Sequence, residues 1–357
     1  MRKYELIGLM SGTSMDGLDI VHVQFDINEL NEWHYKLLAA ETTPYPQEII
    51  DQLTHCTQLN VPLFLQLDKQ MGSIFGEMVN SFIQKNQIEK SNITAIASHG
   101  HTTFHQPDNG FTCQIGCGSS ISYITDIPVI NDFRSKDVIA GGQGAPLVPK
   151  GDLLLFNSLA DSFLNIGGIT NISFSKDDKM YAFDISPGNL PLNKLALSKG
   201  MTYDKNGKLA SAGEINFFLL DLLNSLEYYA QPSPKSLGTE WLTQHFYPLI
   251  KFDKDIENNL RTIIEHEAIQ ISNTLNNNKL KSVFITGGGA KNKFLIERLK
   301  HYYKGEIIIP SDQIIDFKEA IIFALLGALY LAKETNTLAS VTGASQSVRG
   351  GVLHVPN

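Results

Sequence analysis

The stretch that decides the fold is Gly8-Leu-Met-Ser-Gly-Thr-Ser-Met-Asp-Gly-Leu-Asp19. It lies between two apolar runs, 4–7 and 20–25, whose composition predicts strands. Glycine lets a backbone approach a ligand closely, and successive main-chain N–H groups in such a turn can form a nest for phosphate. Hydroxyl and carboxylate oxygens beside that nest suit Mg²⁺. These residues therefore indicate a phosphate-binding turn, with an ordinary glycine-rich hairpin as the open alternative.

Composition is that of an ordinary globular protein. The chain has 357 residues, of which 43% are hydrophobic and 18% charged, so two domains are expected. The formal charge of −8, without a basic stripe, argues against a nucleic-acid partner. No apolar run reaches the ~18 residues of a membrane span, so no membrane partner is expected. Three cysteines and no visible signal peptide predict a protein of the reducing cytoplasm.

The first half of the chain predicts alternating helix and strand. Residues 63–86 carry apolar side chains at helical spacing and should form an amphipathic helix. Residues 93–98 predict a buried strand that delivers His99 to Thr102 at its C-terminal edge, where α/β sheets bind ligands. A turn-rich break at 140–149 indicates a domain junction. We expect domains at 1–135 and 136–344, with the tail 345–357 packing back on the first domain.

The second half opens like the first, with a strand at 162–166, a polar turn at 167–171 and a strand at 172–175. A third strand, 180–183, ends at Asp184. Further on, a strand at 281–285 runs into the glycine cluster 287–290 and then a helix. Strand, glycine cluster and helix make a ligand-binding corner, because a helix N-terminus offers free N–H groups. The pattern indicates a weak internal duplication.

Several common chemistries are excluded. The chain has no Gly-x-x-x-x-Gly-Lys-Ser/Thr, no convincing dinucleotide fingerprint and no Gly-x-Ser-x-Gly elbow. Zinc is the less favoured interpretation of five His and Cys residues, because their spacing fits no standard zinc pattern; they are His99, His101, His105, Cys113 and Cys117.

Asp184 is the sharpest candidate for acid–base chemistry. A carboxylate held at the end of a buried strand is well placed to act as a general base. A turn or capping role is the commoner fate of such an aspartate, and spacing alone favours it.

The chain resembles the anhydro-N-acetylmuramic acid kinases. The resemblance is strongest at Met10 to Asp19 and covers essentially the whole chain. Further family-like blocks follow in order: 98–102, 132–134, 141–149, 164–171, 231–236, 287–292, 319–320 and 340–345.

This resemblance implies an α/β fold of two actin-like (ribonuclease-H-like) domains around an ATP cleft. It also implies a phosphotransferase with an alcohol group as acceptor, which uses ATP and Mg²⁺. Members phosphorylate the 6-oxygen of 1,6-anhydro-N-acetylmuramic acid while water opens the anhydro ring. The product, N-acetylmuramic acid 6-phosphate, belongs to peptidoglycan recycling. The sequence does not determine the oligomeric state, and a homodimer stays open.

The resemblance also assigns residues by position. Asp184 matches the catalytic aspartate, which takes a proton from the attacking water. The expected sugar contacts are His99, Thr102, Arg134 and Glu319, with the arginine fork on the lactyl carboxylate. The expected nucleotide contacts are Gly12, Thr13, Ser14, Met15, Asp16, Gly17, Leu18 and Asp19 for the phosphates, with Asp16 on magnesium, then Gly167, Gly168 and Thr170, and finally Gly287, Gly288, Gly289 and Ala290 against the adenosine.

Departures from the family pattern cluster near the expected sugar. Ile185-Ser186 replaces Thr-Gly after the aspartate, Asn193 replaces a second aspartate, Cys117 stands where Gln-Ile-Gly-Asp ends, and His101 replaces a glutamine. The stretch 311–319 is also short. Because the first turn is intact, we expect ATP binding to be retained. The alternatives are a homologue that binds ATP without catalysis and a kinase of the same fold for another amino sugar.

Overall fold

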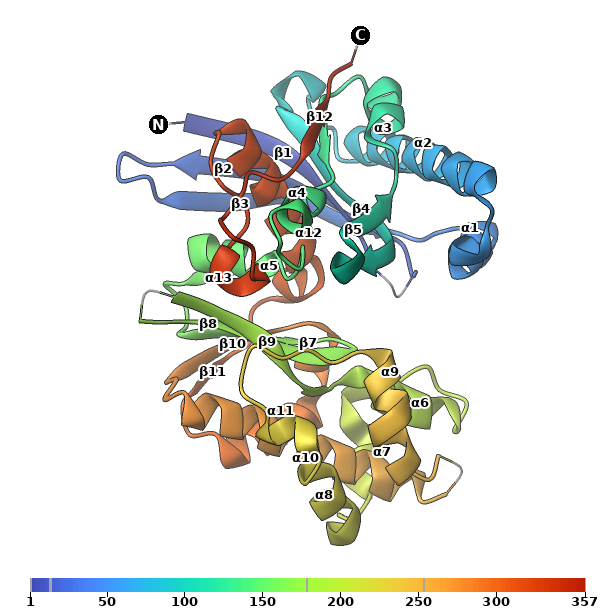
Figure 1. The fold of residues 1–357 in the computed structure, drawn as a ribbon, viewed down its shortest axis with the longest axis vertical. Coiled ribbons are helices and arrows are strands. Elements are labelled where there is room, and N and C mark those ends of the chain that lie inside the picture. Colours follow the sequence, from blue (N-terminus) through green and yellow to red (C-terminus); the bar gives the residue numbers. More distant parts are fainter. Residues whose placement is uncertain (1, 13–14, 178, 253, 357) are drawn as a thin grey trace. The chain divides into compact units, whose positions relative to one another are not determined.

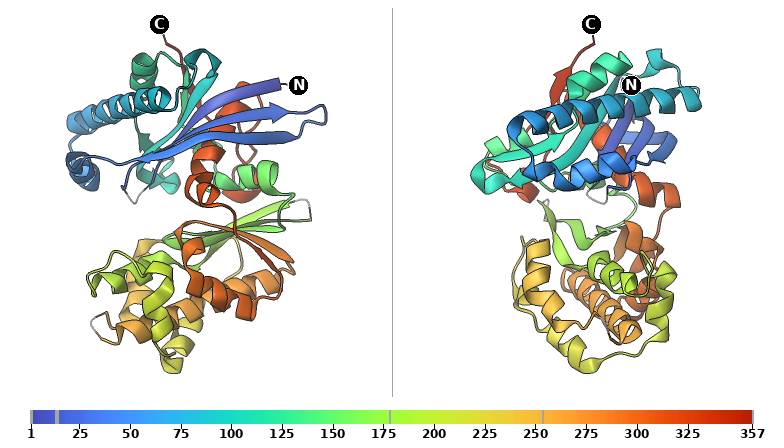
Figure 2. Two further views of the ribbon diagram at one scale, coloured as in Figure 1. Left: turned by 180° about the vertical axis from the view of Figure 1, so that it is seen from behind. Right: turned by 90° about the vertical axis from the view of Figure 1, so that its right-hand side faces the viewer.

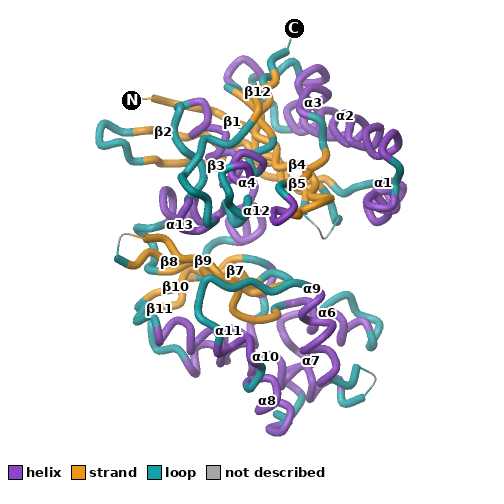
Figure 3. Tube along the Cα trace, in the orientation of Figure 1, coloured by secondary structure: helices purple, strands orange, loops and turns teal. Residues whose placement is uncertain are grey.

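The computed structural model describes residues 2–12, 15–177, 179–252 and 254–356, and it divides the chain into two compact units (Figure 1). Unit 1 comprises Met1–Phe156 and Phe317–Asn357, and unit 2 comprises Asn157–Asp316. Each unit has its own sheet, drawn in orange in Figure 3. Unit 2 is thus a continuous segment, whereas unit 1 is built from both ends of the chain.

The described residues of unit 1 form a seven-stranded mixed sheet in the order β12-β6-β4-β1-β2-β3, with β5 paired to β4. β1, β2 and β3 form an antiparallel meander, and β1, β4 and β6 run parallel. The strands are β1 Arg2–Ser11, β2 Leu18–Ile27, β3 Trp33–Thr43, β4 Ala95–Gln106, β5 Phe111–Ile115, β6 Val129–Asn131 and β12 Val352–His354.

Helices cover the sheet of unit 1 on both faces. One face, with Ile7 and Leu9 of β1, shares a hydrophobic core with α1 and α2. The other face receives α12, whose Gly327 lies so close to Ala97 that an added Cβ would come within 2.7 Å of the alanine Cβ. The helices are α1 Gln47–His55, α2 Val61–Lys85, α3 Gly118–Thr125, α4 Ser135–Ile139, α5 Val148–Gly151, α12 Asp312–Leu331 and α13 Ala339–Thr342. The amphipathic helix expected at 63–86 is confirmed as α2.

The described residues of unit 2 form a five-stranded sheet in the order β11-β10-β7-β8-β9. Its helices gather on one side of that sheet (Figure 2), and α10 runs through the core with Leu260, Ile264 and Ile271 buried. The strands are β7 Ser162–Ile166, β8 Ile169–Lys176, β9 Lys179–Pro187, β10 Ser282–Thr286 and β11 Glu306–Ile308. The helices are α6 Asn189–Leu197, α7 Lys208–Ala212, α8 Phe217–Asn224, α9 Thr239–Trp241, α10 Ile256–Asn277 and α11 Lys293–Tyr302.

The two sheets share one topology. In unit 2, β7, β8 and β9 form an antiparallel meander, and β7, β10 and β11 run parallel, as β1, β4 and β6 do in unit 1. When the hairpin strand β5 and the terminal strand β12 are left out of the count for unit 1, the five strands of each unit have the order 3-2-1-4-5, which is the ribonuclease-H-like arrangement. The α/β class and the expected duplication are therefore confirmed.

The division between the units differs from the expected boundaries at 135/136 and 344/345. Residues 136–156 and 317–344 belong to unit 1. The reason is packing: Gly8 of β1 lies against α12, so that an added Cβ would meet the Ala320 carbonyl at 2.3 Å. Likewise, an added Cβ on Gly151 of α5 would meet the Ile322 side chain of α12 at 2.5 Å. The apolar pattern of α12 indicates burial but not which sheet the helix covers.

Candidate functional site

The first glycine-rich turn is shorter than the sequence indicated. Gly8 to Ser11 extend β1, and Leu18 and Asp19 begin β2, so the turn itself comprises residues 12–17. Thr13 and Ser14 lie outside the described residues. Leu18 is fully buried and belongs to the core, so its side chain packs inward. Among the described residues, the expected cradle is thereby reduced to Gly12 and to Met15, Asp16 and Gly17, with Asp19 at the start of β2.

Two residues fix the backbone of this turn. Met15 has φ +57, and its N–H donates to the Gly12 carbonyl at 3.3 Å. An added Cβ on Gly17 would come within 2.5 Å of the Thr43 carbonyl, so this position requires glycine. Asp16 is exposed, whereas Asp19 accepts a hydrogen bond from the Thr42 hydroxyl at 2.5 Å.

A buried polar network lies beside this turn. Tyr45 donates to Ser11 Oγ at 2.7 Å, and Ser11 Oγ lies 3.0 Å from His101 Nδ1. Burial lowers the pKa of His101 and raises that of Tyr45, so both side chains are neutral near pH 7. His101, which departs from the family pattern, is therefore bonded to the strand that leads into the turn.

The carboxylate oxygens at the first glycine turn are suitable ligands for magnesium. Asp16 and Asp19 both act electrostatically on the Tyr45 hydroxyl, so both carboxylates lie near that side chain. Mg²⁺ is usually held by one or two carboxylates together with water and substrate phosphates. Among the described residues, no group of three or more His, Cys, Asp or Glu is placed to hold a metal by protein ligands alone.

Three of the four expected sugar contacts come together within unit 1. The Nε and Nη2 of Arg134 lie 3.1 and 2.8 Å from His99 Nε2, and the arginine also interacts electrostatically with Glu319. Burial lowers the pKa of Arg134 to about 10, so it stays charged. Burial, aided by the Arg134 charge, lowers the pKa of His99, so its neutral ring accepts from the guanidinium. Burial also raises the pKa of Glu319, against the opposing effect of Arg134.

The sequence indicated that His99 to Thr102 lie at the C-terminal end of a strand. In the structure these residues lie inside β4. β4 extends to Gln106 because it pairs with β5, a hairpin partner that the apolar run 93–98 does not reveal. The β1–β4 register shifts between Leu9 and Ser11, where β4 carries an extra residue and Gly100 has φ +77. Such a bulge re-aims side chains. His99 thus contacts the Phe323 ring of α12, whereas His101 contacts Ser11. Thr102 is bonded to Gln114 at 3.4 Å.

The second glycine turn lies between β7 and β8 in unit 2. Its carbonyls are occupied, because Gly167 O accepts from the N–H of Asn189 at 2.9 Å and Gly168 O from that of Gly188 at 3.0 Å. The N–H groups of Gly167 and Gly168 make no backbone hydrogen bond within the described part of the chain. Gly168 is exposed. The N–H groups of this turn can therefore donate to an anion. The N–H groups at the start of α6 cannot, because they already donate to the carbonyls of the turn.

Thr170 does not offer its side chain to a ligand at the surface. The residue is fully buried, and its hydroxyl donates to Glu267 Oε1 of α10 at 2.5 Å. Burial raises the pKa of Glu267 to about 7, partly offset by this hydrogen bond. Sequence reasoning missed Glu267, which lies in a polar helical segment without a motif; the only signal was a carboxylate amid the apolar positions of α10.

The sequence indicated that a strand ends at Asp184. In the structure Asp184 lies within β9, which continues to Pro187. Strand pairing matches Thr170 with Ser186 and Asn171 with Asp184, which leaves Ile185 as an extra residue. This bulge carries the strand on to Pro187, so the irregular Ile185-Ser186 sequence does not stop it.

The loop around 228–237 orients Asp184. Its Oδ2 accepts from the Leu237 N–H at 2.8 Å, its carbonyl accepts from the Tyr228 hydroxyl at 2.6 Å, and its N–H donates to the Lys235 carbonyl at 3.1 Å. No hydrogen bond to Oδ1 is found within the described ranges. Burial raises the pKa of Asp184 to about 6, although the Leu237 hydrogen bond opposes the shift. Tyr228 and Leu237 were not anticipated, but the family-like block 231–236 lies between them.

The glycine cluster after β10 has one open position. Gly287 has φ +80 and lies against Asn165 and Ile166. An added Cβ on Gly289 would come within 2.0 Å of Ile166 Cγ2, whereas one on Gly288 would meet only Asn189 Nδ2, at 3.7 Å. Gly288 is exposed and Ala290 buried. Gly288 is therefore the member of this cluster that a flat ligand can approach.

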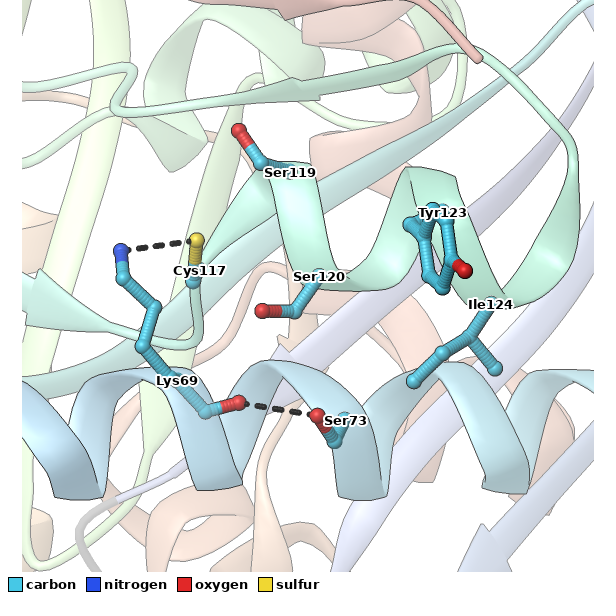
Figure 4. Close-up of a pocket in the computed structure, with 7 residues that line it drawn as sticks. All are labelled: Lys69, Ser73, Cys117, Ser119, Ser120, Tyr123 and Ile124. Carbon is cyan, nitrogen blue, oxygen red and sulfur yellow. Dashed lines mark hydrogen bonds between the residues drawn. The ribbon is translucent and has the colours of Figure 1, made fainter. Parts of the chain in front are cut away.

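Cys117 lies apart from these clusters, in a groove of about 440 Å³ between α2 and α3 (Figure 4). Lys69 of α2 points at it, with Nζ 3.0 Å from Sγ. Burial alone would raise the pKa of the Cys117 thiol, but hydrogen bonds from Lys69 and Ser120 lower it overall. The aspartate-to-cysteine departure therefore produces a polarised thiol.

No helix in the described ranges combines the length and the apolar character needed to cross a membrane.

Comparison with known proteins identifies the family of this chain. Two ribonuclease-H-like units with glycine turns at their first hairpins define the actin-like class of phosphotransferases and ATPases. The family model for anhydro-N-acetylmuramic acid kinase matches residues 4–356, and the chain belongs to this family. It is therefore an enzyme of the kinase class, a transferase of amino-sugar metabolism.

Individual relatives match over their whole length. The chain is 36% identical to the anhydro-N-acetylmuramic acid kinase of Sulfurovum sp. (strain NBC37-1) over 371 residues, which cover 99% of each chain. It is 36% identical to that of Aliivibrio fischeri over 380 residues, which cover 100% of each. Among solved structures, the activator of the 2-hydroxyisocaproyl-CoA dehydratase from Clostridium difficile matches with a TM-score of 0.42 and 13% identity, covering 92% of this chain and 96% of that one.

Proposed function

We propose that this enzyme transfers the γ-phosphoryl group of ATP to the 6-oxygen of 1,6-anhydro-N-acetylmuramic acid while water opens the ring. The observation that carries the residue-level proposal is Asp184. One of its carboxylate oxygens is held by the Leu237 N–H and the other has no hydrogen bond among the described residues. With a pKa of about 6, Asp184 is mostly ionised at pH 7 yet close enough to neutrality to accept a proton.

The proposed reaction couples ring opening to phosphoryl transfer. Asp184 takes a proton from water, whose oxygen attacks the anomeric carbon C1. The C1–O6 bond breaks, and O6 forms a bond to the γ-phosphorus as the bond to the β-phosphate oxygen breaks. The products are N-acetylmuramic acid 6-phosphate and ADP. As in other phosphoryl transfers, the protein contributes mainly position and electrostatics.

The phosphates are proposed to bind at the two glycine turns. The N–H groups of Gly167 and Gly168, which make no backbone hydrogen bond in the described ranges, are suited to anions, and Gly12 with Met15 to Gly17 contributes from unit 1. Asp16, with Asp19 beside it, would hold magnesium, which neutralises phosphate charge. Gly288 would lie against the adenosine, because its outer face is open.

Arg134 is proposed to bind the lactyl carboxylate. Its Nη1 donates to the Gly144 carbonyl at 2.8 Å, while Nε and Nη2 contact His99. These contacts leave one N–H on each terminal nitrogen, which is the number that a bidentate carboxylate pair needs. Glu319 and Thr102 are the proposed partners for sugar hydroxyl or amide groups.

The test is to supply the anhydro sugar, ATP and Mg²⁺ and to follow sugar phosphate by ³¹P NMR alongside ADP. The expected result is one 6-phosphate formed per ADP, with no ADP release when the sugar is omitted. ATP binding without sugar-dependent ADP release would contradict the proposal and indicate a homologue that has lost catalysis. Faster phosphorylation of a free amino sugar than of the anhydro sugar would indicate a different acceptor.

We further propose that the enzyme acts in the cytoplasm and has no nucleic-acid partner. Support comes from three free cysteines, Cys56, Cys113 and Cys117, and from the charge of −8. Thiols persist in a reducing compartment. Detection in an osmotic-shock fraction, rather than with cytoplasmic markers, would contradict the location.

A further inference from the structure

A buried carboxyl group lies behind the second glycine turn, on the core side of the sheet. Glu267, in the middle of α10, is fully buried, and so is Thr170, whose hydroxyl donates to it. The other carboxyl oxygen, Oε2, is buried without a hydrogen-bond partner in the described part of the chain. A buried polar group with a missing partner is costly, so its presence here calls for an explanation.

The Thr170 hydroxyl lies where three backbone features meet. An added Cβ on Gly188 would come within 2.7 Å of this hydroxyl and 2.6 Å of the Gly167 carbonyl, so the hydroxyl, Gly188 and the glycine turn are in close contact. Gly188 in turn donates its N–H to Gly168 O at 3.0 Å. Glu267 therefore holds, through one hydroxyl, the base of the turn whose Gly167 and Gly168 N–H groups make no backbone hydrogen bond in the described part of the chain.

The same hydroxyl adjoins the strand bulge that carries Asp184. Thr170 pairs with Ser186, and the next pair along the ladder is Asn171 with Asp184, with Ile185 bulged between them. The Ser186 hydroxyl is fully buried and has no partner among the described residues, so it provides no competing anchor. Glu267 is thus the side chain that ties the last regular pair before the bulge to the core helix.

We propose that Glu267 is a positioning residue that acts through the Thr170 hydroxyl to fix both the Gly167–Gly168 turn and the Asp184 bulge. For the role of Asp184, this inference rests on the proposed function. For the effect on ATP affinity, it requires only that the Gly167–Gly168 turn binds phosphate. The arrangement needs an acceptor at Oε1 and does not need a charge. A neutral side chain of the same shape therefore serves equally well.

The test compares E267Q, E267M, T170V and the double variant E267M/T170V. Each is assayed for kcat, for the KM of the anhydro sugar and of ATP, and for the affinity of a non-hydrolysable ATP analogue by calorimetry, all well below its melting temperature. E265Q is the matched control: Glu265 is also a buried carboxylate of α10, but it pairs with Arg298 at 2.8 Å.

E267Q is expected to keep kcat within about threefold, because its amide oxygen still accepts from Thr170. E267M and T170V should each lower kcat by roughly 10²-fold, the size of effect that a displacement of about 1 Å produces, and weaken the ATP analogue. The double variant should be no worse than either single variant, because both act through one hydrogen bond. E265Q should lose thermal stability with its kinetic constants unchanged.

Two results would overturn the inference. One is a loss of thermal stability in E267M and T170V with unchanged kcat and unchanged analogue affinity, which a purely structural role predicts. The other is multiplication of the two single effects in the double variant. If the wild-type enzyme binds the analogue but does not turn over the anhydro sugar, the proposed function fails, and the analogue affinities alone then decide the role of Glu267.

Discussion

Asp184 carries the largest consequence at the scale of single residues. Its pKa of about 6 results mainly from burial, since the Leu237 hydrogen bond acts in the opposite direction. Burial disfavours the charged form of a carboxyl group, so the base is present above pH 6 and is lost by protonation below it. The loop at 228–237 thus orients the proposed base, and burial sets its proton affinity against the opposing hydrogen bond from Leu237.

Asp184→Asn is expected to lower kcat by at least ~10²-fold, because the amide cannot accept the proton. In the unmodified enzyme, kcat/KM should fall about tenfold per pH unit below pH 6. Removal of a partly buried charge should leave the melting temperature at pH 8 unchanged or raised. A pH–rate profile with thermal unfolding as control measures both. Retained turnover in the variant, or a flat profile between pH 5 and 7, would remove Asp184 as the base.

Cys117 should be the most reactive thiol of the chain. Lys69 and Ser120 lower its pKa, whereas burial raises the pKa values of Cys56 and Cys113. Because the thiolate is the nucleophile, iodoacetamide at pH 7.5 should alkylate Cys117 first.

Lys69→Met provides the control for this prediction, since it removes the ammonium group and should slow alkylation of Cys117 alone. Time-resolved mass spectrometry of the peptides measures all three rates. An unchanged Cys117 rate in the variant, or faster labelling of Cys56, would contradict the assigned polarisation.

At the scale of elements, two adjacent glycines after β10 differ in their expected roles. Gly289 is required for packing, whereas Gly288 is proposed to contact the nucleotide. An added Cβ on Gly289 would collide with Ile166 at 2.0 Å, whereas one on Gly288 has 3.7 Å of room. Gly289→Ala should therefore lower the free energy of unfolding by about 2 kcal/mol, a typical cost of overpacking.

Gly288→Ala should leave the free energy of unfolding within about 0.5 kcal/mol of wild type and raise the KM for ATP. Urea titration and steady-state kinetics on the pair give both quantities. Equal destabilisation by the two substitutions, or an unchanged KM in Gly288→Ala, would show that Gly288 does not face the nucleotide.

The presence of helices and strands could be predicted from the sequence where the local apolar pattern determines them. Their ends were less predictable where they depend on pairing with other strands. The helix at α2 and the strands near 4–7, 20–25 and 162–166 follow from apolar periodicity. Their ends do not, because Gly8 to Ser11, His99 to Thr102 and Asp184 are strand residues only through pairing with neighbouring strands and bulges. Glu267 left only the weak signal of a carboxylate amid apolar positions, because its hydrogen-bond partner, Thr170, lies 97 positions away.

At the scale of the whole molecule, unit 2 is a continuous segment with a core of its own. A fragment of residues 157–316 is therefore expected to fold alone and to unfold cooperatively, as domains of this size do. Circular dichroism and thermal unfolding test this. A non-cooperative transition would indicate that unit 2 depends on the rest of the chain.

A fragment of residues 1–156 should fail to form a stable fold, because it lacks α12, which covers the β1–β4 face. Fusing 317–357 to it through a flexible linker should restore cooperative unfolding. The compact units differ from the domain boundaries expected from the sequence for the same reason: an apolar pattern indicates that a helix is buried, but tertiary packing alone decides against which sheet it lies.

The split composition of unit 1 also has a consequence during synthesis. The β1–β4 face is complete once residue 131 has left the ribosome, but the part of α12 that belongs to unit 1, from Phe317 on, is encoded after the whole of unit 2. At ~5–20 residues per second, synthesis of residues 132–331 takes roughly 10 to 40 s, which delays the arrival of α12 by that time. Throughout that interval the nascent chain exposes an apolar sheet face, which is the kind of surface that holding chaperones recognise. Unit 2 can meanwhile reach its native state first, even though translation begins with unit 1.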